Sequence, residues 1–187
     1  SDSHPRVANT ALGYLVSQQR TFKDESNKDL WPAFIRDAVT PAAKKYGLEA
    51  KMDEDGAVSQ LRAAVISRLG FDGEDQNVIN KAKEQTQVYL TNPQKVDPYL
   101  AGVYLRLAAF HGDKALLDQF MTTFKTTKDP QVRTNMLAAM GFFGESELQN
   151  AVLAYSLTDE VTASDMRTIL SGQSYTEERQ ALFIDWV

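Results

Sequence analysis

The chain has 187 residues, a formal net charge of -5, and a hydrophobic fraction of 43% that can fill a sizeable core. Its densest basic cluster is the pair Lys44 and Lys45, far from the basic stripe of a nucleic-acid binder or the basic face of a membrane-surface helix. No apolar run approaches the ~20 residues of a membrane span, so we expect neither nucleic acid nor membrane as a partner.

The chain contains no cysteine, which excludes disulfides and thiolate metal ligands. Such a chain is compatible with a cytoplasmic or a periplasmic location. The first residues show no signal peptide and no initial Met, and the last ones, Trp186 and Val187, fall inside a predicted helix. We therefore expect residues 1–187 to form a single helical-repeat segment cut from a longer protein.

Apolar side chains recur at helical spacing along almost the whole chain. Early helices are predicted at about 26–46, 58–69 and 75–90. Later stripes begin at Leu100 and Leu116, and a last one runs from Tyr175 to Trp186 after a capping box at Ser174 and Glu177. No segment alternates strictly between apolar and polar residues. The predicted fold is therefore all-α, with about ten helices.

Two sets of helix-boundary residues repeat at the same interval. Asp97-Pro98 and Asp129-Pro130 each predict an N-cap followed by proline at the first helical position, and they lie 32 residues apart. Gly112-Asp113 and Gly144-Glu145, each a turn glycine and an acidic cap, are also 32 residues apart. The clearest repeats are therefore 97–128 and 129–160, and a degenerate third one begins near Val161.

Each repeat is predicted to be an antiparallel helix pair that cannot bury its apolar face alone. Stacking of neighbouring pairs buries it, and HEAT-like pairs of this kind wind into a right-handed α-α superhelix with a concave side. Glycines predict where helices stop. They are Gly70, Gly112, Gly141, Gly144 and Gly172.

No catalytic or metal-binding motif is present, and we expect no enzyme activity from this chain alone. The two histidines, His4 and His111, are not at ligand spacing, and His111 is expected to stabilise a helix end. The acidic cluster Asp53, Glu54 and Asp55 lacks the ligand spacing of a calcium loop and is expected to be solvated. Neither a catalytic residue nor a metal ligand is therefore predicted.

Four residues are candidates for contacts with a peptide. Arg62, Arg106 and Arg133 lie within helical patterns, where an arginine either pairs with a carboxylate at a helix groove or grips a ligand carboxylate. Tyr99 begins an aromatic stripe with Tyr104, Phe110 and Phe120, which helical spacing assigns more often to core than to a ligand platform. Both interpretations stay open for each residue.

With these residues laid out, the chain resembles the C-terminal helical domain of zinc aminopeptidases of the puromycin-sensitive and endoplasmic-reticulum type. The resemblance runs over most of the chain, best from about Lys44 to Trp186. Its matching stretches are LRAAVISRLGFDG from Leu61, VDPYLAGVYLRLAAFHGD from Val96, DPQVRTNMLAAMGFFGESELQNAVLAYSL from Asp129, and ERQALFIDW from Glu178. Asp185 stands where the family usually has asparagine before the tryptophan.

The resemblance implies a fragment of a longer C-terminal domain, a bowl of helices that closes over an upstream catalytic domain and helps to hold peptide substrates. The parent enzyme would be a zinc-dependent aminopeptidase whose motifs all lie upstream, so no zinc or catalytic residue transfers to this chain. The alternative is a free-standing helical-repeat scaffold for a protein partner, with the resemblance arising from shared helix packing.

Overall fold

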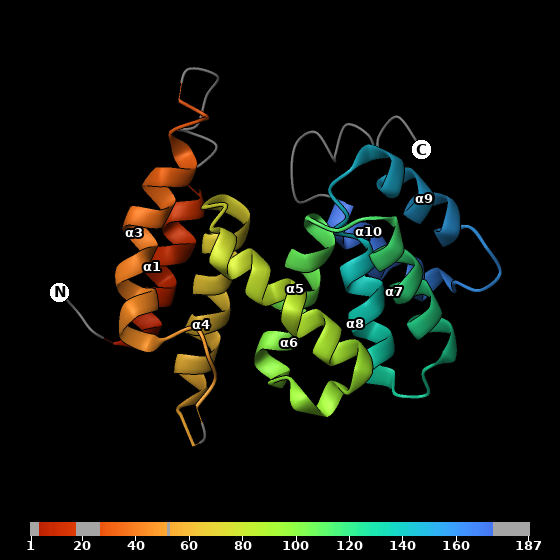
Figure 1. Cartoon of the computed structure of the whole chain (residues 1–187), viewed down its shortest axis with the longest axis horizontal. Helices are drawn as coiled ribbons and strands as arrows, with labels where there is room; N and C mark the ends of the chain where they lie inside the picture. The colour runs from red at the N-terminus through yellow and green to blue at the C-terminus, as the bar shows by residue number, and fades with distance from the viewer. Residues whose placement is uncertain (1–3, 18–26, 52, 174–187) are drawn as a thin grey trace. The chain divides into compact units, whose positions relative to one another are not determined.

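A computed structural model describes residues 4–17, 27–51 and 53–173, and these form helices joined by turns and short loops (Figure 1). Nine α-helices lie within these described ranges, and none of the described residues is in a β-strand, which confirms the all-α prediction. The final stripe from Tyr175 to Trp186 and its capping box fall outside the described residues. The winding of the helix pairs into a right-handed superhelix stays a prediction.

The chain divides into two compact units, each described by itself. Unit 1 comprises residues 1–81 and 97–103, and unit 2 comprises residues 82–96 and 104–187. The helices α5 (Gln76–Thr91) and α6 (Pro98–Phe110) contribute residues to both units.

Unit 1 is built on α1 (Pro5–Ser17), α3 (Trp31–Tyr46) and α4 (Gly56–Ser67), with α4 packed against both others. Each helix buries one apolar stripe, as Trp31, Ile35 and Val39 show at intervals of four residues on α3. Helix α3 begins at Trp31, five residues later than predicted. Helix α1 was not singled out as an element by the sequence analysis.

A π-helix, η1 (Arg68–Asp72), continues directly from α4. The amide of Gly73 donates to the carbonyl oxygen of Arg68 at 2.9 Å, five residues back, which is the π-helical pattern. The prediction that Gly70 ends this helix is therefore wrong, because wider turns carry the chain through it. A pair between Arg68 and Asp72 (2.7 Å) spans the same segment.

Unit 2 contains α7 (Lys114–Thr126), α8 (Pro130–Met140), α9 (Ser146–Ser156) and α10 (Ala163–Gln173); a 3-10 turn, η2 (Pro93–Lys95), precedes α6. Helix α8 packs against α7 and α10, and α10 also contacts α9. Helices α6 and α8 begin 32 residues apart, as do α7 and α9.

Capping side chains explain these starts. Aspartates at 97, 113 and 129 each accept an amide hydrogen bond from the first turn of the following helix, at 2.8–3.0 Å. Thr162 and Asp165 exchange reciprocal bonds at the start of α10. The sequence analysis placed the start of a third repeat near Val161 but did not identify this capping box. Glu145 occupies the N-cap of α9 without a side-chain cap bond. Its extra methylene makes glutamate a poorer cap than aspartate.

The contact between α8 and α10 depends on two glycines. Gly141 follows the last turn of α8 as predicted, whereas Gly172 lies inside α10 rather than after it, so that prediction is wrong. A methyl group on Gly172 would meet backbone atoms of Gly141 at 2.6, 2.7 and 2.9 Å. The glycine at 172 is therefore required by a close approach of two backbones, not by a helix end.

We predict that Gly172→Ala destabilises the protein by about 1–3 kcal/mol, the usual cost of forcing an extra methyl group into a packed contact. The matched control is Gly13→Ala in α1, where an added methyl group meets nothing within 4 Å. Because alanine is the better helix former, this control should stabilise by about 0.5–1 kcal/mol. Urea denaturation followed by circular dichroism measures both, and an unchanged midpoint for Gly172→Ala would contradict the packing described.

Candidate functional site

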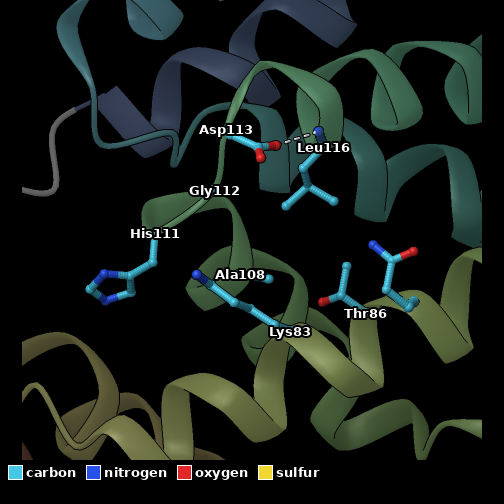
Figure 2. A pocket seen from close by; sticks show the side chains of 8 residues that line it. Lys83, Thr86, Ala108, His111, Gly112, Asp113 and Leu116 are labelled. Atoms are coloured by element: carbon cyan, nitrogen blue, oxygen red, sulfur yellow. Dashed lines mark hydrogen bonds between the residues drawn. The ribbon is translucent and has the colours of Figure 1, made fainter.

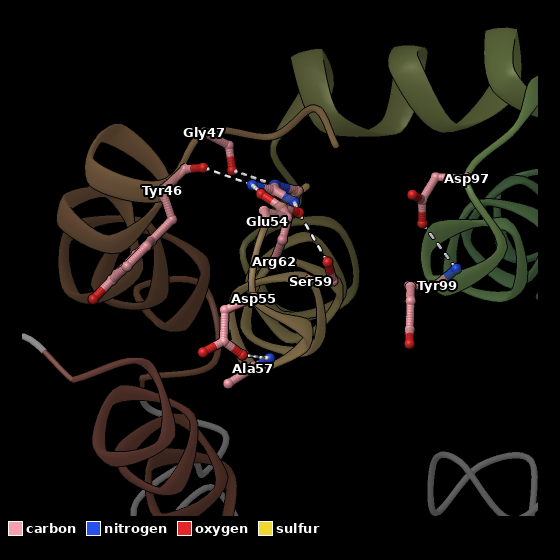
Figure 3. A network of polar contacts seen from close by, with 9 residues as sticks. All are labelled: Tyr46, Gly47, Glu54, Asp55, Ala57, Ser59, Arg62, Asp97 and Tyr99. Atoms are coloured by element: carbon pink, nitrogen blue, oxygen red, sulfur yellow. Dashed lines mark hydrogen bonds and ion pairs between the residues drawn. The ribbon is translucent and has the colours of Figure 1, made fainter. Parts of the chain in front are cut away.

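Arg62 is the most deeply buried of the four candidate residues, at 0% exposure. Its guanidinium forms a two-point pair with the carboxylate of Glu54, one contact at 2.7 Å, and donates to the carbonyl oxygens of Tyr46 (2.9 Å) and Gly47 (3.3 Å) (Figure 3). These bonds tie α4 to the end of α3 and to the loop between them. A peptide contact by Arg62 stays a prediction, and it would have to break this pair.

Glu54 belongs to the acidic cluster that was expected to be solvated. Instead, its side chain is only 12% exposed and accepts bonds from Arg62 and from the Ser59 hydroxyl (2.8 Å). The hydrogen bonds from Arg62 hold the pKa of Glu54 at about 2, against the opposing effect of burial. Asp55 caps α4 through the Ala57 amide (2.8 Å), and Asp53 is exposed. The cluster therefore organises the start of α4.

Arg133, on α8, is also engaged in contacts within its own unit. Its guanidinium donates to Asp165 at 2.9 Å and lies 3.8 Å from the centre of the Phe124 ring. Burial opposes ionisation of Asp165, but hydrogen bonds from Arg133 and Thr162 outweigh it and lower the pKa of that carboxyl. The arginine thus joins α7, α8 and α10.

The other two candidates, Arg106 and Tyr99, both lie on α6. The Arg106 guanidinium lies 5.6 Å from the centre of the Phe142 ring and is partly exposed. Tyr99 is 58% exposed, and Figure 3 shows its ring apart from the Arg62 network. The core interpretation holds for Tyr104 and Phe120, which are buried, but not for Tyr99.

A small pocket in unit 2, of about 190 Å³, was missed by the sequence analysis (Figure 2). It is lined by residues of α5, of α6, of the turn that follows α6, and of the first turn of α7: Lys83, Thr86, Gln87, Ala108, His111, Gly112, Asp113 and Leu116. His111 was expected only to stabilise a helix end. It follows the last residue of α6, is partly buried, and packs edge-on against Phe110 with ring centres 5.1 Å apart. In the sequence, the only pattern that marked this region was the turn formed by Gly112 and Asp113.

The described ranges contain no group of three histidine or acidic side chains arranged to hold a metal ion. His4 accepts the amide of Arg6 at the start of α1 (3.3 Å). Among the helices described, none is both long and apolar enough to cross a membrane.

The whole sequence, residues 1–187, matches the family described as the ERAP1-like C-terminal domain. This chain belongs to that family. The match confirms the resemblance that the sequence suggested, and it makes this ERAP1-like domain part of an aminopeptidase.

Several arginines and aspartates of this ERAP1-like domain, which are residue types common in active sites, stabilise its structure. Arg62 and Arg133 bind carboxylates between helices, and the aspartates at helix starts cap amides. Among the described residues, Tyr99 exposes an aromatic ring on α6, Arg106 lies over the Phe142 ring, and unit 2 contains a small pocket.

We predict that Glu54→Gln lowers the free energy of unfolding by about 3 kcal/mol at pH 7, because it leaves a buried guanidinium without its counter-charge. The depressed pKa of Glu54 contributes stability that is complete above pH 4.5 and is lost as the pH falls towards 2. The difference between wild type and variant should therefore shrink across this window. Urea titrations at pH 7, 4.5 and 3 test it, and a difference independent of pH would contradict the ion pair.

Proposed function

We propose that this ERAP1-like domain is a non-catalytic segment of a zinc-dependent aminopeptidase, where it encloses the active-site cavity and contributes to peptide access and binding. The observation that carries the proposal is the family match over the entire chain. The upstream catalytic domain of the same polypeptide and the peptide substrates are then its partners. In this proposal the zinc is held by that catalytic domain, since the sequence of this chain carries no zinc-binding motif.

The helical fold supports this role on physical grounds. In repeat proteins, helix pairs packed in succession create an extended surface that suits enclosure and binding. Two of the four candidate residues, Arg62 and Arg133, each stabilise the helix packing of their own unit. Peptide binding is therefore assigned first to Tyr99 and Arg106. The free-standing scaffold considered from the sequence has no specific observation in its favour.

The purified 187-residue chain should be helical by circular dichroism, bind no stoichiometric zinc, and cleave no aminoacyl reporter. The reason is that the sequence carries neither a zinc-binding motif nor a nucleophile motif. Zinc is measured by elemental analysis after dialysis, and cleavage by release of a fluorescent amine. Turnover by this chain alone, at a rate proportional to its concentration, would refute the non-catalytic role.

In the parent enzyme, Tyr99→Ala should raise KM for long peptides about 2–10-fold, the loss expected for one aromatic contact of about 0.5–1.5 kcal/mol. The rate on a single aminoacyl reporter, which is too short to reach this domain, should not change. Arg106→Gln should behave in the same way.

The matched control for Tyr99→Ala is Tyr14→Ala, which removes a comparably exposed tyrosine (68%) from α1. It should leave both substrates unaffected. If Tyr99→Ala and Arg106→Gln both leave the KM of long peptides at the wild-type value, these residues do not bind substrate.

A further inference from the structure

The pocket in unit 2 combines opposite charges with an apolar wall. Figure 2 shows Lys83 and Asp113 on different sides of it, with Ala108 and Leu116 between them. The Asp113 carboxylate uses one oxygen to cap α7, accepting the Leu116 amide at 3.0 Å. Its second oxygen makes no hydrogen bond that the structure shows. Lys83 is exposed and forms no ion pair with any residue of the described ranges.

Thr86 gives a second, independent indication of a ligand. Its side chain is 1% exposed, and its hydroxyl has no hydrogen-bond partner among the described residues. A buried hydroxyl left without a partner costs about 1–3 kcal/mol, and most buried polar groups in folded proteins avoid that cost. Because Thr86 lines the pocket, a polar ligand atom entering there can satisfy it.

The size of the pocket limits what can enter. Its volume of about 190 Å³ lies below the ~300–1,000 Å³ of sites for drug-sized ligands. It exceeds the ~150 Å³ of a cavity that holds benzene. This volume suits a single small molecule with a short apolar body better than it suits several residues of a peptide.

We propose that this pocket binds one free α-amino acid as a zwitterion. Lys83 contacts the α-carboxylate, the second oxygen of Asp113 contacts the α-ammonium, and the Thr86 hydroxyl bonds to a carboxylate oxygen. Ala108 and Leu116 receive a short aliphatic side chain. The inference stands on the pocket alone and does not require the proposed function, although an aminopeptidase releases ligands of this class.

The test is a titration of the ¹⁵N-labelled 187-residue chain with L-valine, followed by amide chemical shifts. Two part-molecules serve as controls: 3-methylbutanoate lacks the ammonium group, and 2-methylpropylamine lacks the carboxylate. Saturable shifts at the amides of Thr86, Gly112 and Leu116 are expected with L-valine. Each part-molecule should bind at least about tenfold more weakly, since each loses at least one charge-assisted bond of about 1.5–3 kcal/mol.

Variants identify the residues responsible. Asp113→Asn keeps an acceptor for the helix cap and removes the charge, and Thr86→Val preserves shape without the hydroxyl. Each of these two variants should weaken the binding of L-valine at least about fivefold, and Lys83→Gln should do the same. The control Lys128→Gln changes an exposed lysine that does not line the pocket, and should leave affinity unchanged.

Three outcomes would overturn the inference. They are the absence of saturable shifts, equal binding of 3-methylbutanoate and L-valine, and affinities insensitive to all three pocket variants. The first would mean that water satisfies Thr86, and the second that the pocket accepts simple anions. None of them bears on peptide KM in the parent enzyme, so the proposed function is judged separately.

Discussion

Burial of one apolar face per helix is the constraint on which the rest of the structure depends. The described α-helices have 11–16 residues, a length at which an isolated helix is marginal in water. Each is therefore stable only against its neighbours. In unit 2, helices that meet this requirement recur along the chain at nearly constant intervals. The pairs Gln87–Gln119 and Arg133–Asp165 both join residues 32 positions apart, so corresponding positions of successive repeats meet.

The predictions that the structure matches most closely are the helix starts at aspartate. Aspartate before proline, or three residues before an apolar stripe, gives a helix start because the aspartate oxygen satisfies amides that nothing else can reach. The π-helix η1 and the position of Gly172 were missed for the opposite reason. Both involve contacts with another element: η1 packs against α3, and Gly172 lies where the α8 and α10 backbones approach closely. Neither leaves a local pattern in the sequence.

The candidate site shows the same division between what was predictable and what was not. The sequence identified arginines that either pair with carboxylates or bind ligands, and the structure supplies the partners. Glu54 lies in the loop before α4, eight residues before Arg62, which lies within α4. No helical spacing rule pairs residues so placed. Asp165 is one repeat interval of 32 residues from Arg133, but that interval by itself does not predict a contact. The pocket could not have been foreseen, since its lining comes from three separate segments.

Several charges at the helix ends and grooves of this domain have an identifiable structural task. The aspartates at 55, 97, 113 and 129 satisfy helix amides, and Arg62 and Arg133 neutralise carboxylates. The pocket in unit 2 differs in bringing together groups that such tasks leave available. Lys83 lines it together with the unpartnered hydroxyl of Thr86 and the unused oxygen of Asp113. The meeting of these three groups, rather than the lack of a partner for any one of them, marks the pocket as a place for a ligand.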